Sequence, residues 1–320
     1  MAIDAELLLD RRALRRKLSF WRVVGIGALI VAAGTAGWRA AGVRGFPAVT
    51  PQIARITIDG FIAGSDKTRD LMRRVGESGA VSGVVVSINS PGGTTTGSEE
   101  LFRNLRLLAE KKPVVAFVDG TAASGAYITA LAADHIVARE TALVGSIGVL
   151  FQYPDLSGLL DKVGVKVEEV KSSPLKAEPS GFHPTPPEAR AALQAIIGDT
   201  FAWFKGLVAD RRGMTPAQID AVADGRVFSG RQSVGLRLVD ETGGERQAVA
   251  WLEREKGVAK DLPVRDWKPR ADNRFGLFSA AALGADLFGY ADLAARLRQA
   301  SEETADLARG GLLAVWRPAP

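Results

Sequence analysis

Short apolar runs alternate with helical segments over most of the chain, and this alternation constrains the fold more than any other feature of the sequence. Ile53–Ile58 alternates in polarity and predicts a strand, while Lys67–Val75 predicts a helix. Gly83–Ile88 is a β-branched run that predicts a buried strand, and Asn89–Gly93 is expected to end it. Because strands and helices in this order favour parallel pairing with right-handed crossovers, the sequence predicts an α/β domain.

The same order continues further along the chain. Thr96 and Glu99 have the spacing of a capping box, which predicts the start of a helix. Val114–Val118 is the next predicted strand, and a helix of small residues should follow it. Two more strands are expected near Ile136 and Val144. This part of the chain therefore extends the same α/β sheet.

A long helix should begin at Pro184–Glu188, with Thr185 and Glu188 as cap partners. Its predicted apolar stripe consists of Leu193, Ile196, Ile197, Phe204, Leu207 and Val208. We assign residues 53–257 to the α/β domain and residues 258–320 to a C-terminal tail that is helical by composition and has no assigned role.

The N-terminus has the order of a membrane signal. Six cations precede an uncharged stretch, Val23–Trp38, and they are Arg11, Arg12, Arg15, Arg16, Lys17 and Arg22. We expect residues 1–20 in the cytoplasm, a transmembrane anchor at 21–38 and a linker at 39–52. A cleaved signal peptide and a buried core helix are the alternatives. Nucleic acid is not expected as a partner, because few aromatic residues interleave with these cations.

The stretch Gly120–Tyr127 (Gly-Thr-Ala-Ala-Ser-Gly-Ala-Tyr) is where chemistry is most expected. A strand entering a helix of tiny residues can expose Ser124 at the helix N-terminus, where free N–H groups favour negative charge. The N–H of Gly125 could donate one hydrogen bond to an oxyanion, and the Pro91–Gly93 loop could supply a second. Each motif alone is more often a turn or a cap than a site.

A serine nucleophile needs a base, and the chain has only two histidines. His135 lies in a strand pattern and is interpreted as structural, and His183 lies in a proline-rich loop. A lysine is the alternative, provided that its pKa falls from about 10.4 through burial or nearby cations. Lys176 lies in a Ser-Ser-Pro-Leu-Lys loop, although most lysines are simply solvated surface charges.

Taken together, these motifs resemble the signal peptide peptidase A family of serine proteases. The resemblance rests on the Ser124 motif, on Asn89–Gly93, and on Gly145–Val149 (Gly-Ser-Ile-Gly-Val). The stretch Gly225–Gly230, followed by Gly235-Leu and Val239-Asp, fits as well, so that the resemblance covers roughly residues 53–250. It implies a ClpP/crotonase-like α/β fold behind an N-terminal transmembrane helix.

The family's site residues transfer to this sequence by motif. The resemblance implies Ser124 as nucleophile, Lys176 as general base and Ser146 as the residue that positions the lysine. The local sequence of the lysine departs from the family form, which leaves Lys171 as the reserve. Backbone N–H groups of Gly93 and Gly125 would form the oxyanion hole, with no metal and no cofactor. The sequence also contains no phosphate-binding G-x-x-x-x-G-K-[ST] loop.

The resemblance also implies an activity and a location. The chain would be a membrane-bound serine endopeptidase that degrades remnant signal peptides and other short apolar peptides through an acyl-enzyme. It would form a homo-oligomeric ring, an octamer, with each serine and lysine meeting across a subunit boundary. It would lie in the bacterial inner membrane by a single pass, with residues 39–320 on the extracytoplasmic side and lipid around residues 21–38. The alternatives are a catalytically inactive membrane scaffold and a crotonase-type acyl-CoA enzyme.

Overall fold

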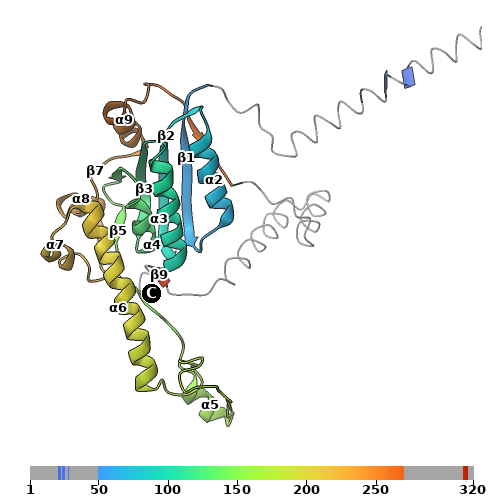
Figure 1. The fold of residues 1–320 in the computed structure, drawn as a ribbon, viewed down its shortest axis with the longest axis vertical. Helices are drawn as coiled ribbons and strands as arrows, with labels where there is room; N and C mark the ends of the chain where they lie inside the picture. The colour runs from blue at the N-terminus through green and yellow to red at the C-terminus, as the bar shows by residue number, and fades with distance from the viewer. Residues whose placement is uncertain (1–20, 23, 26–27, 29–49, 270–312, 316–320) are drawn as a thin grey trace, which may run out of the picture. The chain divides into compact units, whose positions relative to one another are not determined.

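The computed structural model describes residues 21, 22, 24, 25, 28, 50–269 and 313–315 (Figure 1). The chain divides into two compact units, Met1–Thr50 and Pro51–Pro320. The described positions of the predicted anchor, residues 21–38, are helical, and the rest of that anchor lies outside the described residues. Among the residues that the structure describes, no helix combines the length and apolar character needed to span a bilayer.

Three long parallel strands form the centre of the second unit (Figure 1). They are β1 (Gln52–Ile62), β2 (Val81–Thr94) and β3 (Val114–Ala123), and β2 lies between the other two. Their apolar residues point alternately to the two faces of the sheet, as the period of a strand requires. The predicted strands and their parallel pairing are therefore confirmed for this part of the chain.

Shorter strands complete the sheet along the edge of β3 that faces away from β2. The first half of β3 pairs with β4 (His135–Ala138), and its second half pairs with β5 (Leu143–Gly145). β6 (Val227–Ser229) joins β5 antiparallel, and β7 (Glu241–Thr242) joins β4 parallel. Because β3 changes partner midway, its carboxyl end is held in a separate part of the sheet from its beginning.

Helices cover both faces of the sheet. α2 (Asp66–Glu77) and α3 (Thr95–Ala109) pack on one face, together with α4 (Gly125–Ala130). α9 (Glu245–Lys256) covers the other face, where Trp251 and Leu252 meet the opposite side chains of the central strands. The predicted inward residues of α3 are confirmed, since Leu101, Leu105 and Leu108 are buried and Phe102 is partly buried.

Two predicted helix caps are wrong, although both helices begin close to the predicted positions. The cap of α3 is Thr94, whose hydroxyl accepts from Gly97 N–H, rather than Thr96. The long helix α6 (Pro187–Arg212) begins after Pro186 without a side-chain cap, because the Thr185 hydroxyl is 2.7 Å from the hydroxyl of Tyr153 and bonds there instead. In α3 a neighbouring threonine is the cap, and in α6 a tertiary contact holds the hydroxyl that local spacing assigned to the cap.

The strand β2 also runs through Asn89–Gly93, where the sequence predicted its end. The ladder is irregular there, with register shifts between Asp59 and Phe61 on β1. A bulge of this kind bends a strand without ending it. The turn-like sequence therefore produces a bend inside β2 rather than a loop after it.

Residues 150–186 form a projection that we call the arm. It contains α5 (Ser157–Val163) and lies at the far end of α6 from the sheet (Figure 1). Val165–Val170 has a β-like sequence, but these residues are exposed and have no strand partner among the described residues. The apolar stripe of α6 is buried at Phe204 and Val208 but not at Ile196, which is 51% exposed.

The tail contributes strands to the sheet. β8 (Val264–Asp266) pairs with β1 in parallel, and β9 (Leu313–Val315) pairs antiparallel with the end of β2. The helical prediction for the tail is therefore wrong at these positions, because an open strand edge determined their conformation where composition favoured a helix. The residues between Lys268 and Leu313 lie, apart from position 269, outside the described residues.

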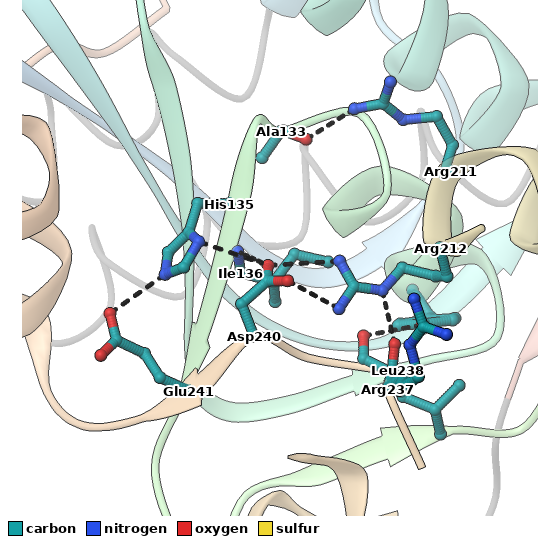
Figure 2. Close-up of polar contacts among 10 residues, drawn as sticks. Ala133, His135, Ile136, Arg211, Arg212, Arg237, Leu238, Asp240 and Glu241 are labelled. Atoms are coloured by element: carbon teal, nitrogen blue, oxygen red, sulfur yellow. Dashed lines mark hydrogen bonds and ion pairs between the residues drawn. The ribbon is translucent and has the colours of Figure 1, made fainter. Parts of the chain in front are cut away.

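Small helices and one polar network hold α6 against the sheet. α7 (Pro216–Asp220) and α8 (Gly230–Gly235) follow α6, and both begin with a capping box. Figure 2 shows Arg212 forming two ion-pair contacts with Asp240, at 2.8 and 3.2 Å, while Asp240 accepts from Ile136 N–H. These contacts fix the end of α6 to β4 and β7.

Candidate active site

Ser124 occupies a sharp turn between β3 and α4. Its backbone has φ 54° and ψ −118°, and only 2% of the residue is exposed. A residue other than glycine with positive φ is strained by about 1–3 kcal/mol, and such strain concentrates at functional sites. The hydroxyl of Ser124 forms no hydrogen bond with any residue in the described part of the chain. The geometry is that of a serine held at the point where a strand enters a helix.

The structure brings Ser146 next to Ser124. The last residue of β3, Ala123, is in register with Gly145 of β5, and Ser124 N–H donates to Gly145 O at 2.7 Å. Ser146 also has positive φ, 50°, and its N–H donates to Arg226 O at 2.8 Å. Two strained serines therefore follow the ends of two paired strands.

The glycine turn of β2 lies beside the same strand end. Ser90 of β2 is in register with Ala122 of β3, and Gly92 and Gly93 follow immediately. A Cβ atom on Gly93 would come within 1.8 Å of Ile62 O, so no other residue fits there. Gly92, with φ 104°, donates its N–H to the Ser90 hydroxyl at 3.1 Å. The structure thus brings the predicted oxyanion residue Gly93 into the neighbourhood of Ser124.

The helix after Ser124 is fully buried and held at its far end by arginines. Arg211 donates to Leu131 O at 2.7 Å and to Ala133 O at 2.8 Å, the latter drawn in Figure 2. Arg106 donates to Ala132 O at 2.8 Å. Cations at a helix C-terminus satisfy its last carbonyls and favour the helix dipole. At its other end, the first N–H groups of α4, including that of Gly125, have no intrahelical partner.

The sequence prediction missed Arg211. Its partners are 78 and 80 positions away along the chain, so no local pattern could reveal them. Burial lowers the pKa of this guanidinium. Tyr127 also has a distant partner, since its hydroxyl donates to Leu238 O at 2.8 Å. Burial raises the pKa of this hydroxyl. Both residues hold α4 in place.

His135 lies at the opposite end of the strands. It is in register with Val115, and the strand from Val115 to Ala123 spans about 26 Å at ~3.3 Å per residue. Its ring stacks on Trp251 with 4.7 Å between centroids, and its Nε2 lies 3.0 Å from Glu241 Oε1 (Figure 2). The interpretation of His135 as structural is consistent with this network, and His135 cannot reach Ser124.

The two candidate lysines have different surroundings in the arm. Lys171 forms ion pairs with Glu169 and Glu178, and these hydrogen bonds raise the pKa of Lys171. Glu178 is only two positions from Lys176 in the sequence, yet the structure pairs it with Lys171 and with His183 Nε2 at 3.1 Å. Lys176 is exposed and forms no ion pair within the described residues.

The cluster around Lys171 also contains the groups that could ligate a cation. Possible ligand atoms of Glu169, Glu178 and His183 all lie within 4.8 Å of one another. The Lys171 ammonium contacts both carboxylates and already supplies the compensating positive charge. This arrangement links two carboxylates of the arm to one ammonium by ion pairs.

The structure brings only part of the predicted site together. Ser124, Ser146 and the glycine turn are adjacent, whereas Lys176 lies on the arm, between α5 and α6 in the chain. Within residues 50–269, no histidine or lysine side chain forms a hydrogen bond with Ser124.

Comparison with known proteins identifies the family. The model of peptidase family S49 matches residues 106–259. A candidate protease of Methanocaldococcus jannaschii is 38% identical over 198 residues, which are 62% of this chain and 64% of the relative. A candidate protease of Synechocystis sp. is 36% identical over 223 residues, 68% of this chain and 80% of the relative.

A third relative is the chloroplastic serine protease SPPA of Arabidopsis thaliana, 33% identical over 195 residues, 60% of this chain and 29% of the relative. The matched part thus makes up less than two thirds of the archaeal and the plant relatives and most of the cyanobacterial one. The matched region includes Ser124, Ser146 and Lys176. On this likeness, the chain belongs to peptidase family S49, as a peptidase of the signal peptide peptidase A type.

Proposed function

We propose that this protein is a serine endopeptidase in which Ser124 is the nucleophile. The observation that carries the proposal is the strained backbone of Ser124, φ 54°, at a strand-to-helix turn beside Ser146 and the glycine turn. Such a turn presents a nucleophile at a helix N-terminus, where N–H groups can bind an oxyanion. Membership of family S49 and relatives named as proteases support the same reading.

The proposed reaction is acyl transfer with Lys176 as the base. The neutral amine takes the proton from Ser124 Oγ, which attacks the peptide carbonyl while Gly93 and Gly125 N–H groups bind the oxyanion. The leaving amine takes the proton from the lysine, and water activated by Lys176 then hydrolyses the ester. Ser146 would hold the amine of Lys176 by a hydrogen bond without adding charge. The sheet and its flanking helices are consistent with the ClpP/crotonase-like fold that we propose for this peptidase.

A second subunit would have to bring the lysine to the serine. The arm exposes an unusual amount of apolar surface, which favours contact with another protein surface. Its most exposed apolar residues are Leu159, Val163, Val165, Val167, Val170 and Leu175. A neighbouring copy that covered this surface would also desolvate Lys176, which lowers the pKa of a lysine. We therefore propose a ring-shaped homo-oligomer, an octamer, with active sites shared between subunits.

The proposed location is the bacterial inner membrane. The cations that precede residues 21–38 support a single-pass anchor in contact with lipid, with the catalytic domain on the extracytoplasmic side. Substrates would then be remnant signal peptides and other short apolar peptides. Alkaline phosphatase fused after residue 320 should be active, and an expressed but inactive fusion would contradict this topology.

The nucleophile is tested with a fluorophosphonate probe and with hydrolysis of an apolar peptide. Ser124→Ala should lose labelling and retain less than a few per cent of hydrolysis, with unchanged folding. Ser173→Ala, at an exposed serine of the arm, should keep both. Labelling that persists in Ser124→Ala would remove Ser124 from this role. A folded wild-type chain that neither labels nor hydrolyses would favour a membrane scaffold.

The base is tested by a pair of lysine variants. Lys176→Met should be as inactive as Ser124→Ala, and the double variant should be no worse, because the two side chains act as one unit. Lys171→Met should retain activity, since its ammonium is held charged by two carboxylates. The opposite result, with Lys171→Met inactive, would reassign the base while leaving the serine mechanism intact.

A further inference from the structure

Ser90 is a buried serine at the start of the glycine turn, and the proposed reaction gives it no role. The residue is 0% exposed. Its hydroxyl donates to Gly60 O at 2.6 Å and accepts from Gly92 N–H at 3.1 Å. We propose that Ser90 is a positioning residue for the oxyanion hole, because its hydroxyl fixes the turn that carries the N–H of Gly93. This inference rests on the proposed peptidase function.

The Ser90 hydroxyl joins β1 and β2 across the bulge in their ladder. At the bulge β1 contributes Gly60 alone, whereas β2 contributes both Ser90 and Pro91. A proline has no N–H and cannot donate to the neighbouring strand. The side chain of Ser90 supplies a donor to Gly60 O at this point. The two strands are therefore held together where the ladder is irregular.

The same hydroxyl also holds the glycine turn itself. Gly92 has φ 104°, a conformation that glycine adopts readily and other residues do not. The same freedom allows the backbone to rotate at a glycine unless another contact prevents it. The hydrogen bond from Gly92 N–H to Ser90 Oγ is buried and restrains this rotation. Because the N–H of Gly93 belongs to the next peptide group, its direction depends on how Gly92 is held.

The backbone of Ser90 connects the turn to the strand that ends at the nucleophile. Ser90 is in register with Ala122 of β3, two residues before Ser124. One residue thus links the proposed oxyanion donor, through its side chain, to the proposed nucleophile, through its main chain. A misplacement of about 1 Å between reacting groups can cost about 10²-fold in rate. Loss of the Ser90 hydroxyl should therefore affect catalysis as well as stability.

The expected effect is a loss of kcat without a loss of substrate binding. Ser90→Ala removes both side-chain hydrogen bonds and adds no bulk. Removing one oxyanion donor costs about 10²–10³-fold in kcat. Since Gly93 N–H would be displaced rather than removed, we expect kcat and kcat/KM to fall together by about 10–100-fold. KM should change by less than about twofold, which marks an interaction made only in the transition state.

The experiment compares Ser90→Ala with a matched variant in the full-length chain. Ser98 is also 0% exposed, and its hydroxyl donates to Thr94 O at 2.9 Å within α3. Ser98→Ala should therefore lose similar stability in urea unfolding and keep its kcat. Hydrolysis is measured with the aminomethylcoumarin amide of acetyl-Leu-Leu-Leu.

A second measurement reads the oxyanion hole directly. The probe is the peptide aldehyde acetyl-Leu-Leu-leucinal, compared with its unreactive alcohol, acetyl-Leu-Leu-leucinol. Ser124 Oγ adds to the aldehyde carbon, its proton passes to the base, and the carbonyl oxygen becomes the oxyanion. The ratio of aldehyde to alcohol affinity should fall by about 10–100-fold in Ser90→Ala, in parallel with kcat, and stay unchanged in Ser98→Ala.

The possible results separate this inference from the proposed activity. If Ser90→Ala loses stability but keeps kcat and the affinity ratio, the inference is overturned and the peptidase stands. A higher KM with unchanged kcat would overturn it too. If Ser90→Ala does not fold, Ser90→Cys decides, because a thiol fills the space but bonds weakly, and normal kcat there would overturn the inference. A folded wild-type chain without hydrolysis or aldehyde binding would reject both the peptidase and the role of Ser90.

Discussion

Replacing Ser124 by glycine should make the protein inactive but more stable than the alanine variant at the same position. Both Ser124→Gly and Ser124→Ala remove the hydroxyl, so both should abolish hydrolysis. They differ in the backbone, because alanine keeps the Cβ that makes φ 54° unfavourable and glycine does not. The comparison of these two variants therefore isolates the strain at the nucleophile turn.

The magnitude follows from two opposing effects. Releasing the strain of a non-glycine residue at positive φ stabilises the fold by about 1–3 kcal/mol. Glycine in turn gives the unfolded chain more freedom, which costs about 0.5–1 kcal/mol. Since the residue is only 2% exposed and both variants remove the hydroxyl, the remaining terms nearly cancel. We expect Ser124→Gly to be more stable than Ser124→Ala by about 1 kcal/mol, or roughly 2–4 °C in Tm.

The assay is urea or thermal unfolding of the full-length variants in detergent, with peptide hydrolysis measured in parallel. Ser98 provides the matched control, because it is buried in α3, where the backbone is helical. There glycine should be less stable than alanine by about 0.5–1 kcal/mol, the reverse of the order at Ser124. If Ser124→Gly is no more stable than Ser124→Ala, the turn is not strained and this reasoning fails.

Three further outcomes are expected. Gly93→Ala should abolish activity and lower stability, measured by hydrolysis and urea unfolding, since a Cβ would lie 1.8 Å from Ile62 O. Arg211→Met should reduce the free energy of unfolding by about 2–3 kcal/mol and slow probe labelling, because two carbonyls at the end of α4 lose charged donors. The protection factors of residues 165–183 in hydrogen exchange, measured against the unfolded chain at each pH, should be highest at intermediate pH. Because the pKa of Glu178 is lowered, protection should fall as the pH drops below about 4.3. Because the pKa of Lys171 is raised, protection should also fall as the pH rises above about 10.4. Lys171→Met should weaken both dependences.

Much of the central sheet could be predicted from local pattern. The runs that form β1, β2 and β3 are long, apolar and separated by amphipathic segments, so their period and order suffice to predict parallel pairing. The inward face of α3 follows from the same kind of periodicity. The loop at Asn89–Gly93 was predicted wrongly, because a bulge and a turn share the same glycine-rich composition and only the pairing with β1 distinguishes them.

The residues of the candidate site could likewise be selected from the sequence, but their arrangement could not. Ser124, Gly93 and Ser146 stand next to glycines at predicted strand ends, and motif resemblance was enough to select them. Their proximity depends on the register of β3 with β2 and β5, which is a property of the whole sheet. Arg211 was not predicted, because its partners are backbone carbonyls of a distant helix and carry no residue type to recognise.

The sequence by itself therefore determined the class of fold, the nucleophile candidate and the family, because these depend on short-range periodicity and on motifs a few residues long. Only the tertiary structure decided that Glu178 pairs with Lys171, that Lys176 remains exposed on the arm, and that β9 lies against Gly92–Thr94. The Glu178–Lys171 pair, seven positions apart, depends on how the arm folds back on itself, and the position of β9 depends on an open strand edge. Neither depends on a local pattern of residue types, so neither could be predicted from the sequence.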